Sequence, residues 1–382
     1  MKKKVLILAG YYEPSVKGGG PIQSLKNLVD NLSNKLDFYI VAMDRDLGDD
    51  KPFPNVETNK WISGGKAKIF YIDPVKLTWK KISDIINSVD YDVMYLNSFF
   101  SYKFSIVPLL LKKIKKIPQK PVILAPRGQF SPGALGLKSW KKKLYIKITK
   151  ALGLYKNIIW HATAENERED IEAVFGKDAN IRIASNLTAN YMTLRYEKNI
   201  KKEKGELKIV FISRIHPNKN LKKALELLKC IDGKIDFNIY GPIEDKTYWE
   251  DCKKMIEDLP QNIKVSYKGI VAHDKVIDIF KQHHIFLFPT LGENFGHVIS
   301  EALIGGCPVI ISNQTPWKNL EQKQVGWDIS LCDENRFINA IQYCVNLSNE
   351  QYNILSKNAF EYGKKLSNSI DDINQAFRLV DI

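Results

Sequence analysis

Short apolar runs rich in β-branched residues alternate with amphipathic segments along most of this chain of 382 residues. Such runs are typical of buried parallel strands, and the segments between them are typical of helices that carry the chain from one strand to the next. We therefore expect an α/β protein with doubly wound parallel sheets. The expected strands are Val5–Leu8, Phe38–Ala42, Ile69–Ile72, Val93–Leu96, Val122–Ala125, Ile158–His161, Ile209–Ile212, Phe237–Tyr240, Val265–Tyr267, Ile285–Phe288 and Val309–Ile311.

A polar stretch rich in lysine and glutamate separates two series of these runs. Residues 196–207 lack a clear apolar face, so we expect them to link an N-terminal domain, residues 1–195, to a C-terminal domain, residues 208–365. Residues 366–382 continue a helical pattern without a partner strand, and we expect this helix to pack across the domain junction. Other helices are expected at Ile22–Leu32, Leu221–Leu228, Asp274–Phe280 and Val298–Leu303.

The positive charge of the chain is concentrated in its first half. The formal net charge is +14, and residues 1–190 hold 31 Lys and Arg against 18 Asp and Glu. Between Asp92 and Glu165 there is no carboxylate, whereas 14 basic residues lie there. Such a surface favours an anionic partner, and solvated lysines on helix faces are the alternative explanation.

The cysteines and the N-terminal residues indicate the cellular compartment in which the protein resides. The five cysteines all lie in the second half and form no C-x-x-C pair, so neither a zinc site nor a disulfide framework is expected. The apolar run after Lys4 is too short for a secretory signal peptide. We therefore expect a cytoplasmic protein.

Two motifs that follow expected strands suit a bound anion. Lys17–Pro21 contains three glycines and leads into a helix, so the backbone N–H groups of Gly19 and Gly20 can approach a phosphate closely. Arg214 and Lys219 follow the first strand of the second half, five residues apart across a turn, and two such cations suit a diphosphate. A tight structural loop and a pair of solvated surface charges are the respective alternatives.

A third motif places two carboxylates around the start of a helix. Gly292–Leu303 has Glu293 in a loop after a strand and Glu301 about two turns into the following helix. From Gly296 onward the helix offers N–H groups to a phosphate, while Glu301 is placed to bind ribose hydroxyls and Glu293 those of a sugar. A solvated helix residue is the alternative for Glu301, but its neighbours are apolar.

These three motifs, in this order, resemble the retaining glycosyltransferases of the GT-B fold, family 4, also called glycosyltransferases group 1. Glu293 and Glu301 resemble the paired glutamates of that family's signature, Arg214 and Lys219 its diphosphate clamp, and Gly18–Gly20 its glycine loop. The resemblance implies two tandem Rossmann-like domains with an interdomain cleft, the first binding the acceptor and the second a nucleotide sugar, and a last helix that crosses back to the first domain. The residues expected at the donor are Gly19, Gly20, Arg214, Lys219, Gly241, Asn294, Phe295, Gly296, His297 and Glu301.

One motif departs from the family pattern. In Ala125–Gly133, Arg127 occupies the position at which many family members carry a histidine. We expect Arg127 to contact donor or acceptor oxygens, with a purely structural arginine as the alternative. His161, at the end of another strand, is a second candidate, although a lone histidine is more often a packed core residue. The residues expected to act in catalysis are Arg127, Arg214, Lys219 and Glu293.

The resemblance implies a hexosyltransferase-type enzyme that uses a nucleoside diphosphate sugar as donor, with no metal ion and no further cofactor. Ile311–Trp317 and Gly326–Trp327 are similar to members that act in bacterial surface-polysaccharide assembly, such as O-antigen or capsule synthesis. Lys138–Lys156 mixes cations with apolar residues, a composition typical of an interfacial helix. The expected partners are therefore a glycan acceptor, either free or carried on a lipid pyrophosphate, and an anionic membrane surface on the cytoplasmic side. A core-facing helix with a solvated basic face is the alternative.

Three other functions remain open on the sequence. A nucleotide-sugar 2-epimerase would share the fold and the phosphate clamp, but it has no need of a basic acceptor domain directed to a membrane. A metal-dependent transferase of another fold would use a D-x-D pair, which Asp44 and Asp46 supply, although the tandem domains argue against it. A nucleic-acid-binding protein would exploit the basic half, but the sequence has no helix-turn-helix or finger motif, so we expect no nucleic-acid partner.

Overall fold

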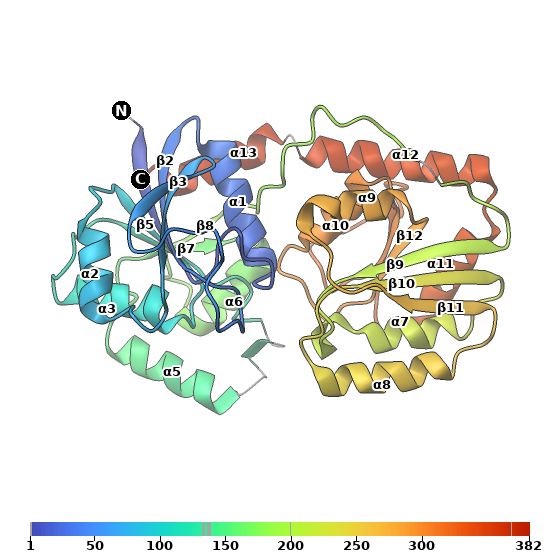
Figure 1. The fold of residues 1–382 in the computed structure, drawn as a ribbon, viewed down its shortest axis with the longest axis horizontal. Helices are drawn as coiled ribbons and strands as arrows, with labels where there is room; N and C mark the ends of the chain where they lie inside the picture. The colour runs from blue at the N-terminus through green and yellow to red at the C-terminus, as the bar shows by residue number, and fades with distance from the viewer. Residues whose placement is uncertain (1, 132–133, 136–138, 199, 368) are drawn as a thin grey trace. The chain divides into compact units, whose positions relative to one another are not determined.

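The computed structural model describes residues 2–131, 134–135, 139–198, 200–367 and 369–382. It divides the chain into two compact units, which Figure 1 shows in ribbon form. Unit 1 comprises Met1–Ala189 and Ser369–Ile382, and unit 2 comprises Asn190–Asn368. Pro132, Gly133 and Lys138, which belong to two of the sequence motifs, lie outside the described residues.

Unit 1 is built on an eight-stranded sheet with the order β3-β4-β2-β1-β5-β6-β7-β8. Neighbouring strands pair in parallel, except β3 and β4. Residues of β1 alternate between two apolar clusters, with Leu6 and Leu8 in one and Val5 and Ile7 in the other. Both faces of the strand are buried, which explains its continuous apolar run. The strands are β1 (Lys3–Ala9), β2 (Leu36–Met43), β3 (Trp61–Gly64), β4 (Ala67–Ile72), β5 (Val93–Asn97), β6 (Val122–Ala125), β7 (Ile159–Ala162) and β8 (Ile181–Ile183).

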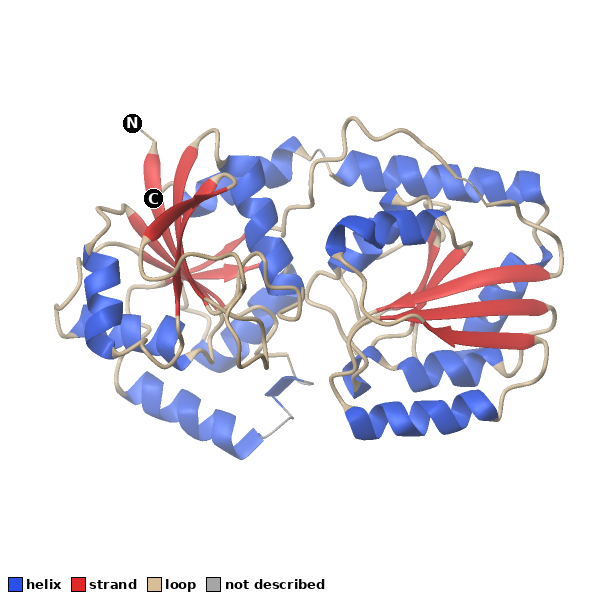
Figure 2. Cartoon of the chain, viewed as in Figure 1, coloured by secondary structure: helices blue, strands red, loops and turns tan. Residues whose placement is uncertain are grey.

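Helices cover both faces of this sheet (Figure 2). The last helix, α13, contacts α1 and β8 and buries Ala376, Leu379 and Val380 in one of the two clusters of unit 1. Lys3 Nζ lies 2.8 Å from the carboxylate of Asp381, so the first strand and the last residues are held together. The helices are α1 (Gly20–Leu32), α2 (Trp79–Asn87), the π-helical turn η1 (Tyr102–Ile106), α3 (Val107–Lys113), α5 (Ser139–Ala151), α6 (Glu165–Phe175) and α13 (Ile370–Val380).

Unit 2 is built on a six-stranded parallel sheet with the order β11-β10-β9-β12-β13-β14. In order along the chain this is the 3-2-1-4-5-6 arrangement of doubly wound nucleotide-binding sheets. The order reverses between β9 and β12, and ligands of such sheets bind at the carboxyl ends of the strands at that point. The strands are β9 (Glu206–Ile212), β10 (Lys234–Tyr240), β11 (Ile263–Tyr267), β12 (Ile285–Phe288), β13 (Val309–Ser312) and β14 (Gly326–Ile329).

One apolar cluster holds unit 2 together and includes residues of its strands and of the helices on both faces. Side chains define several helix starts: Asp245 accepts from the N–H of Tyr248 at the start of α8, and Ser348 and Gln351 form a capping box at the start of α12. The helices are the turn η2 (Pro217–Lys219), α7 (Leu221–Leu228), α8 (Lys246–Glu257), the turn η3 (His273–Lys275), α9 (Val276–Lys281), α10 (His297–Ile304), α11 (Glu334–Asn346) and α12 (Asn349–Leu366).

Each apolar run expected to form a strand coincides with a strand of one of the two sheets, apart from Ile158, which lies just before β7, and the expected α/β class is confirmed. The sequence did not indicate β3, β8 or β14. All three are short strands at the edge of a sheet, where fewer side chains are buried. They therefore lack the continuous apolar run by which the central strands were recognised.

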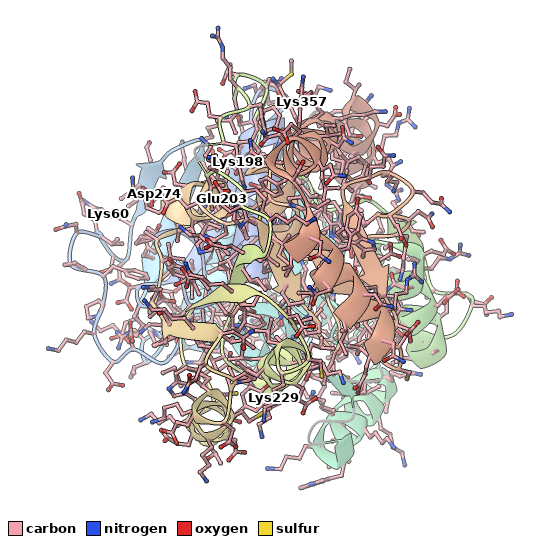
Figure 3. The ribbon with its side chains drawn as sticks, turned by 90° about the vertical axis from the view of Figure 1, so that its right-hand side faces the viewer. Lys60, Lys198, Glu203, Lys229, Asp274 and Lys357 are labelled. Atoms are coloured by element: carbon pink, nitrogen blue, oxygen red, sulfur yellow. The ribbon has the colours of Figure 1, made fainter. Side chains whose placement is uncertain are left out.

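The stretch expected to be a linker is instead attached to unit 2. Lys198 Nζ donates to the carbonyls of Phe280 (3.0 Å), near the end of α9, and of His283 (2.7 Å), just after it. Lys202 Nζ donates to the carbonyl of Val345 (2.9 Å) near the end of α11. Burial lowers the pKa of Lys198 to about 8 and also lowers the pKa of Lys202. Lysine side chains commonly satisfy the last carbonyls of helices in this way. The polar stretch therefore runs along unit 2 (Figure 3). The boundary between the two compact units falls between residues 189 and 190 of the chain.

Candidate functional site

Two loops of unit 2 are joined at the carboxyl ends of β9 and β12. The N–H of Leu291 donates to the carbonyl of Asn218 (2.9 Å), and Asn220 Nδ2 donates to the carbonyl of Pro289 (2.9 Å). Because β9 and β12 flank the reversal of strand order, this is the position at which a doubly wound sheet binds its ligand. The two loops carry Lys219 and Glu293, both predicted from the sequence.

Lys219 and Glu293 form an ion pair in this loop region. Lys219 Nζ lies 2.5 Å from Glu293 Oε1, and the two side chains are only 12% and 13% exposed. Glu293 Oε1 also accepts from the hydroxyl of Thr290 (3.2 Å), and its backbone N–H donates to the carbonyl of Gln314 (3.0 Å). Water screens a pair this buried only weakly, so the lysine charge acts strongly on any group that enters beside it.

Arg214 has a different environment from Lys219. Its Nη1 lies 2.5 Å from Glu244 Oε2 in the loop after β10, and the two side chains are 39% and 38% exposed. An exposed pair of this kind contributes little to stability, so a phosphate could replace the carboxylate at small cost. The sequence analysis did not anticipate Glu244, which follows the strand next to β9 in the sheet.

The helix α10 begins inside the predicted motif that carries the two carboxylates, Glu293 and Glu301. Gly296 precedes its first residue with φ of 78°, a left-handed conformation that favours glycine. Glu301 is buried within α10, as its apolar neighbours indicated, and its Oε1 lies 2.9 Å from His273 Nε2. Burial and the neighbouring charge of Glu301 raise the pKa of Tyr191. The carboxylate thus has a fixed position just over one turn inside α10, not the two turns expected from the sequence, in a helix whose first N–H groups face the loop.

Gly241, Phe295 and His297 also lie at the carboxyl edge of this sheet. A Cβ atom at Gly241 would lie 1.9 Å from the carbonyl oxygen of Ser213, so glycine is required where the loops after β9 and β10 cross. The ring of Phe295 packs between His297 (centroids 4.7 Å apart) and Trp317 (5.7 Å), and its carbonyl accepts from Trp317 Nε1 (2.6 Å). These residues support the loop that leads into α10. Asn294 lies in the same loop.

Two side chains of this region escaped the sequence analysis. Thr290, which is fully buried, donates to the carbonyl of Asn218 (3.1 Å) and also contacts Glu293, while His273 contacts Glu301. The available signal was their position: both follow the carboxyl end of a strand, β12 and β11 respectively, and polar residues at such ends commonly face the ligand. Together these groups offer cations, N–H donors and fixed carboxylates to a ligand that carries both phosphates and hydroxyls.

Arg127 lies in unit 1, at the carboxyl end of β6, inside a network of hydrogen bonds. Its Nε donates to Asn97 Oδ1 (2.7 Å), its Nη1 to Asn186 Oδ1 (2.6 Å) and its Nη2 to the hydroxyl of Tyr95 (2.9 Å). All three partners are buried. The guanidinium is therefore fixed by three acceptors. This environment suits a purely structural arginine, and it also suits an arginine that is held in position to contact a substrate.

The turn that contains Arg127 is held by a buried carboxylate. Arg127 has φ of 57°, an uncommon value for a residue other than glycine. Glu167, from α6, accepts from the N–H of Gly128 (2.6 Å) and from the N–H and hydroxyl of Thr163 (2.8 Å and 2.6 Å). Gln129 accepts in turn from the N–H of Phe99 (2.7 Å). Several hydrogen bonds thus hold the strained backbone of this turn in place. Such strain is common where a functional side chain needs a fixed direction.

His161 is the packed core histidine that the alternative reading described. Its Nε2 donates to the carbonyl of Ala184 (2.8 Å), so its Nδ1 accepts from the hydroxyl of Tyr95 (2.6 Å). Burial, together with the nearby charge of Arg127, lowers the pKa of His161 to about 3. His161 is therefore neutral at neutral pH and acts on Arg127 through Tyr95.

We expect mild acid to destabilise the protein through its buried histidines. Burial lowers the pKa of both His161 and His284 to about 3, whereas histidine in an unfolded chain titrates near about pH 6.5. Below that pH the unfolded chain binds more protons than the folded chain, so the free energy of unfolding falls as the pH decreases. Each histidine should contribute a loss of about 2 kcal/mol between about pH 8 and about pH 5, measured by urea unfolding.

A variant isolates one of these two contributions. His161→Asn removes the ring that must stay neutral in unit 1 and leaves His284 in unit 2 unchanged. The free energy of unfolding of the variant should depend less steeply on pH, by about one proton. Equal slopes for the variant and the original chain would contradict the assignment of His161 as a buried neutral base.

The glycine loop of unit 1 is fixed by a residue of the D-x-D pair. Asp46 accepts from the hydroxyl of Ser15 and from the N–H groups of Val16 (2.8 Å) and Lys17 (3.1 Å). Burial alone would raise the pKa of Asp46, but these hydrogen bonds hold it below its ordinary value. Asp44 pairs with Arg45 (2.8 Å). Asp46 therefore serves the loop before Gly19 and Gly20, which start α1, whereas the contact of Asp44 is with its neighbour Arg45.

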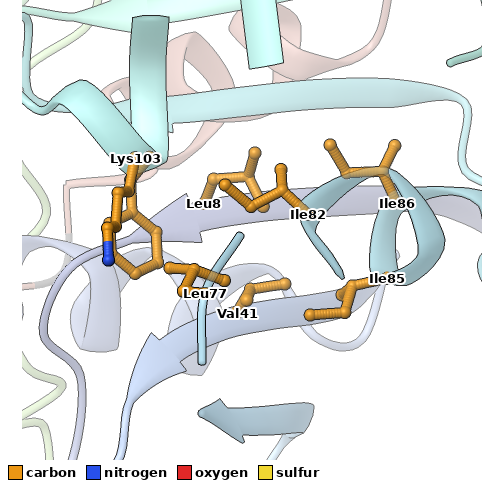
Figure 4. Close-up of a pocket in the computed structure, with 8 residues that line it drawn as sticks. Leu8, Val41, Leu77, Ile82, Ile85, Ile86 and Lys103 are labelled. Atoms are coloured by element: carbon orange, nitrogen blue, oxygen red, sulfur yellow. The ribbon is translucent and has the colours of Figure 1, made fainter. Parts of the chain in front are cut away.

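A hollow in unit 1, between the sheet and α2, does not offer a ligand site (Figure 4). It has a volume of about 10 Å³, which is about the room that a single water molecule requires. Its lining residues are Leu8, Val41, Leu77, Ile82, Ile85, Ile86, Lys103 and Phe104. The lining is almost entirely apolar, so the hollow belongs to the core.

Comparison with known sequences finds one family whose model matches most of unit 2. The family Glycosyl transferases group 1 matches residues 193–362. An uncharacterized 41.2 kDa protein in the cps region of Klebsiella pneumoniae is 27% identical over 230 residues, which cover 58% of this chain and 60% of that protein. Across the curated relatives that match, the aligned part spans 24% to 60% of their own length.

Comparison with solved structures covers both units. HepE from Anabaena, in complex with UDP and glucose, has a TM-score of 0.69 at 14% identity, with 98% of each chain covered. Sucrose-phosphate synthase from Thermosynechococcus elongatus has a TM-score of 0.74 at 15% identity, with 99% of this chain and 98% of that chain covered. At this identity the likeness establishes the fold, and the expected GT-B fold is confirmed.

Proposed function

We propose that this protein, a glycosyltransferase of the GT-B fold whose second unit belongs to glycosyltransferases group 1, transfers a sugar from a nucleoside diphosphate sugar to a glycan acceptor. The observation that carries the proposal is the buried ion pair of Lys219 and Glu293, next to the loop that starts α10. It lies at the strand ends where doubly wound sheets bind nucleotides. The solved complex of HepE with UDP and glucose is compatible with a donor of this class.

The chemistry of sugar transfer fits these side chains. As the bond to the anomeric carbon breaks, negative charge grows on the departing diphosphate, and Lys219 and the first N–H groups of α10 are fixed donors for that charge. Arg214 can leave Glu244 and join them, because that ion pair is exposed. Glu293 then orients sugar hydroxyls, and Glu301 accepts hydrogen bonds from the ribose.

Thermal unfolding with nucleotides tests this assignment. UDP, GDP and dTDP are added in turn to the whole chain in EDTA, and we expect at least one of them to raise the Tm. A ligand at one hundred times its Kd adds about 2.7 kcal/mol to the free energy of unfolding. Because the positive charge comes from side chains and backbone, binding and transfer should not require a metal ion. The absence of any shift with all three nucleotides would overturn the donor site.

We further infer that the reaction retains the anomeric configuration and serves surface-polysaccharide synthesis. Retention follows from the resemblance to family 4, in which the acceptor attacks from the face that the diphosphate leaves. The relative in the cps region of Klebsiella pneumoniae supports a role in polysaccharide assembly. Analysis of the product by NMR distinguishes transfer with retention from inversion, and also from 2-epimerisation of the donor.

The helix α5 supports a membrane-bound acceptor, which we propose to be linked to a lipid pyrophosphate. Trp140, Leu144, Ile148 and Leu152 recur every four residues along α5 and its end, and they are between 42% and 66% exposed. Exposed lysines lie between them, a pattern typical of helices in a membrane interface. Of the helices in the described part of the chain, none has the length and apolarity to cross a bilayer. Peripheral attachment to an anionic leaflet on the cytoplasmic side accounts for this surface.

Charge reversal on α5 tests the attachment. We expect the triple change of Lys141, Lys143 and Lys147 to Glu to weaken binding to vesicles of phosphatidylglycerol and phosphatidylcholine by about 100-fold or more, because each cation near the surface contributes about 1 kcal/mol. Cosedimentation measures the binding.

The matched control reverses three exposed lysines of unit 2, Lys229, Lys264 and Lys357, which changes the net charge equally. This control should bind the vesicles with unchanged affinity, and the α5 variant should keep its affinity for nucleotide. Equal loss in both triple variants would show a general charge effect and would contradict a role for α5.

A further inference from the structure

Unit 2 contains a second hollow, whose lining residues all lie between Glu321 and Asn358, after the donor loops in the sequence. Its volume is about 590 Å³, within the range of ligand-binding sites. It lies among the edge strand β14, one face of α11, the first half of α12 and the loop before β14. The lining residues are Glu321, Gln324, Gly326, Trp327, Arg336, Asn339, Ala340, Tyr343, Gln351, Ile354, Leu355 and Asn358.

The position of the hollow separates it from the donor site. Gly326 is the first residue of β14, and the sheet is parallel, so the hollow lies toward the amino ends of the strands. Lys219 and Glu293 follow the carboxyl ends of β9 and β12. The hollow and the donor site therefore share no residue, and a ligand in one does not need the other.

An aromatic pair forms one wall of this hollow. Trp327 and Tyr343 meet edge to face with centroids 5.8 Å apart, and Tyr343 is 54% exposed although it belongs to a helix packed on the core. Large rings are costly to leave in water, and paired rings are a common contact surface for ligands. The C–H groups of a sugar ring pack well against such a face because the ring face carries partial negative charge.

The polar side chains of the hollow are mostly amides. Gln324, Asn339, Gln351 and Asn358 line it, and Asn358 Nδ2 donates to Gln324 Oε1 at 3.3 Å. An amide both donates and accepts hydrogen bonds, as does a sugar hydroxyl. The lining has equal numbers of cations and anions, because its only two charged residues are Arg336 and Glu321, whose side chains are 2.6 Å apart.

We propose that this hollow is a second saccharide site, which binds a segment of an uncharged glycan between the Trp327–Tyr343 pair and the four amides. The proposal deepens the proposed function and rests on it for its role: an enzyme that builds a glycan would hold part of the chain there while its end reacts elsewhere. The neutral lining does not suit a phosphate, a nucleic acid or an anionic membrane. A second copy of this chain that adds to the edge of β14 is the competing occupant, although this edge strand has only four residues.

Affinity electrophoresis tests the site on the whole chain. Gels contain dextran, galactan, mannan or oligomers of N-acetylglucosamine, and we expect at least one of these neutral glycans to retard the protein. Tyr343→Ala should weaken that interaction about 10-fold or more, and Asn339→Ala by about 3- to 10-fold, since each removes one contact from an exposed side chain. Tyr343→Phe keeps the ring and should retain most of the affinity.

The control changes Lys357, which lies on α12 outside the lining (Figure 3). Lys357→Ala should leave the retardation unchanged. All four variants should keep the Tm shift given by nucleotide, so a failure here is distinguishable from failure of the donor assignment. The proposal is overturned if no neutral glycan retards the protein, if Tyr343→Ala migrates like the original chain, or if light scattering shows a dimer that Tyr343→Ala dissociates.

Discussion

Lys219→Ala should lower kcat/KM for the nucleotide sugar about 100- to 1000-fold, the largest effect that we expect from one substitution in unit 2. Lys219 is the least exposed cation at the carboxyl ends of β9 and β12, so in the proposed donor site its charge would act on the departing phosphate with little screening. The change also leaves Glu293 without its partner. Initial rates at several donor concentrations, with the Tm shift by nucleotide, measure the loss.

Two comparisons separate the role of this lysine from a general effect. Lys222→Ala removes a neighbouring lysine whose partner is Asp251 (2.8 Å) on α8, and it should leave kcat/KM within about 2-fold. Lys219→Ala combined with Glu293→Gln should cost less than the sum of the two single changes, because the side chains touch. Unchanged turnover and donor affinity in Lys219→Ala would remove the proposed donor site.

Arg127→Met should lower the free energy of unfolding of unit 1 by about 3 to 5 kcal/mol. The guanidinium satisfies the buried oxygens of Asn97, Asn186 and Tyr95, and removing a donor from a buried acceptor costs about 1 to 3 kcal/mol. Arg127→Gly removes the same donors but relieves a φ of 57°, so it should be the more stable variant by about 1 kcal/mol. Urea unfolding measures both.

Arg168 offers the matched control for Arg127. It lies in the same unit, and its guanidinium pairs with Glu165 and Glu172 (both 2.9 Å) on the surface of α6. Arg168→Met should cost no more than about 1 kcal/mol. Enzyme assays below the unfolding range then show whether Arg127 also touches substrate: an activity loss beyond the unfolded fraction indicates contact, and normal activity of the folded fraction assigns it a purely structural role.

The central strands and the paired loops of unit 2 could be predicted because their signals are local. A strand buried on both faces, such as β1, must be apolar at consecutive positions, and Glu293 and Lys219 each follow such a strand. The chain topology then brings the ends of β9 and β12 together, so residues far apart in sequence meet without any further signal. The buried position of Glu301 was likewise readable from its apolar neighbours.

Other features depend on partners that local patterns do not reveal. The polar stretch around Lys202 looks like a linker, but that lysine is buried because its ammonium satisfies carbonyls at the end of α11. Asp46 resembles half of a metal site, yet it binds the backbone of a loop about thirty residues earlier. His273, which meets Glu301, comes from another strand end. In each case the role of the residue depends on a partner that is distant in the sequence. The chemistry of the residue itself does not identify that partner.

The return of α13 to unit 1 fixes the order in which the chain can mature during synthesis. All of unit 2 has been translated before the ribosome reaches Ser369, whereas unit 1 still lacks the helix that places Ala376, Leu379 and Val380 in its core. Domains usually mature from the N-terminus onward, but here the later unit is complete first. A released chain that ends before Ser369 should therefore protect unit 2 from protease while unit 1 is still cleaved.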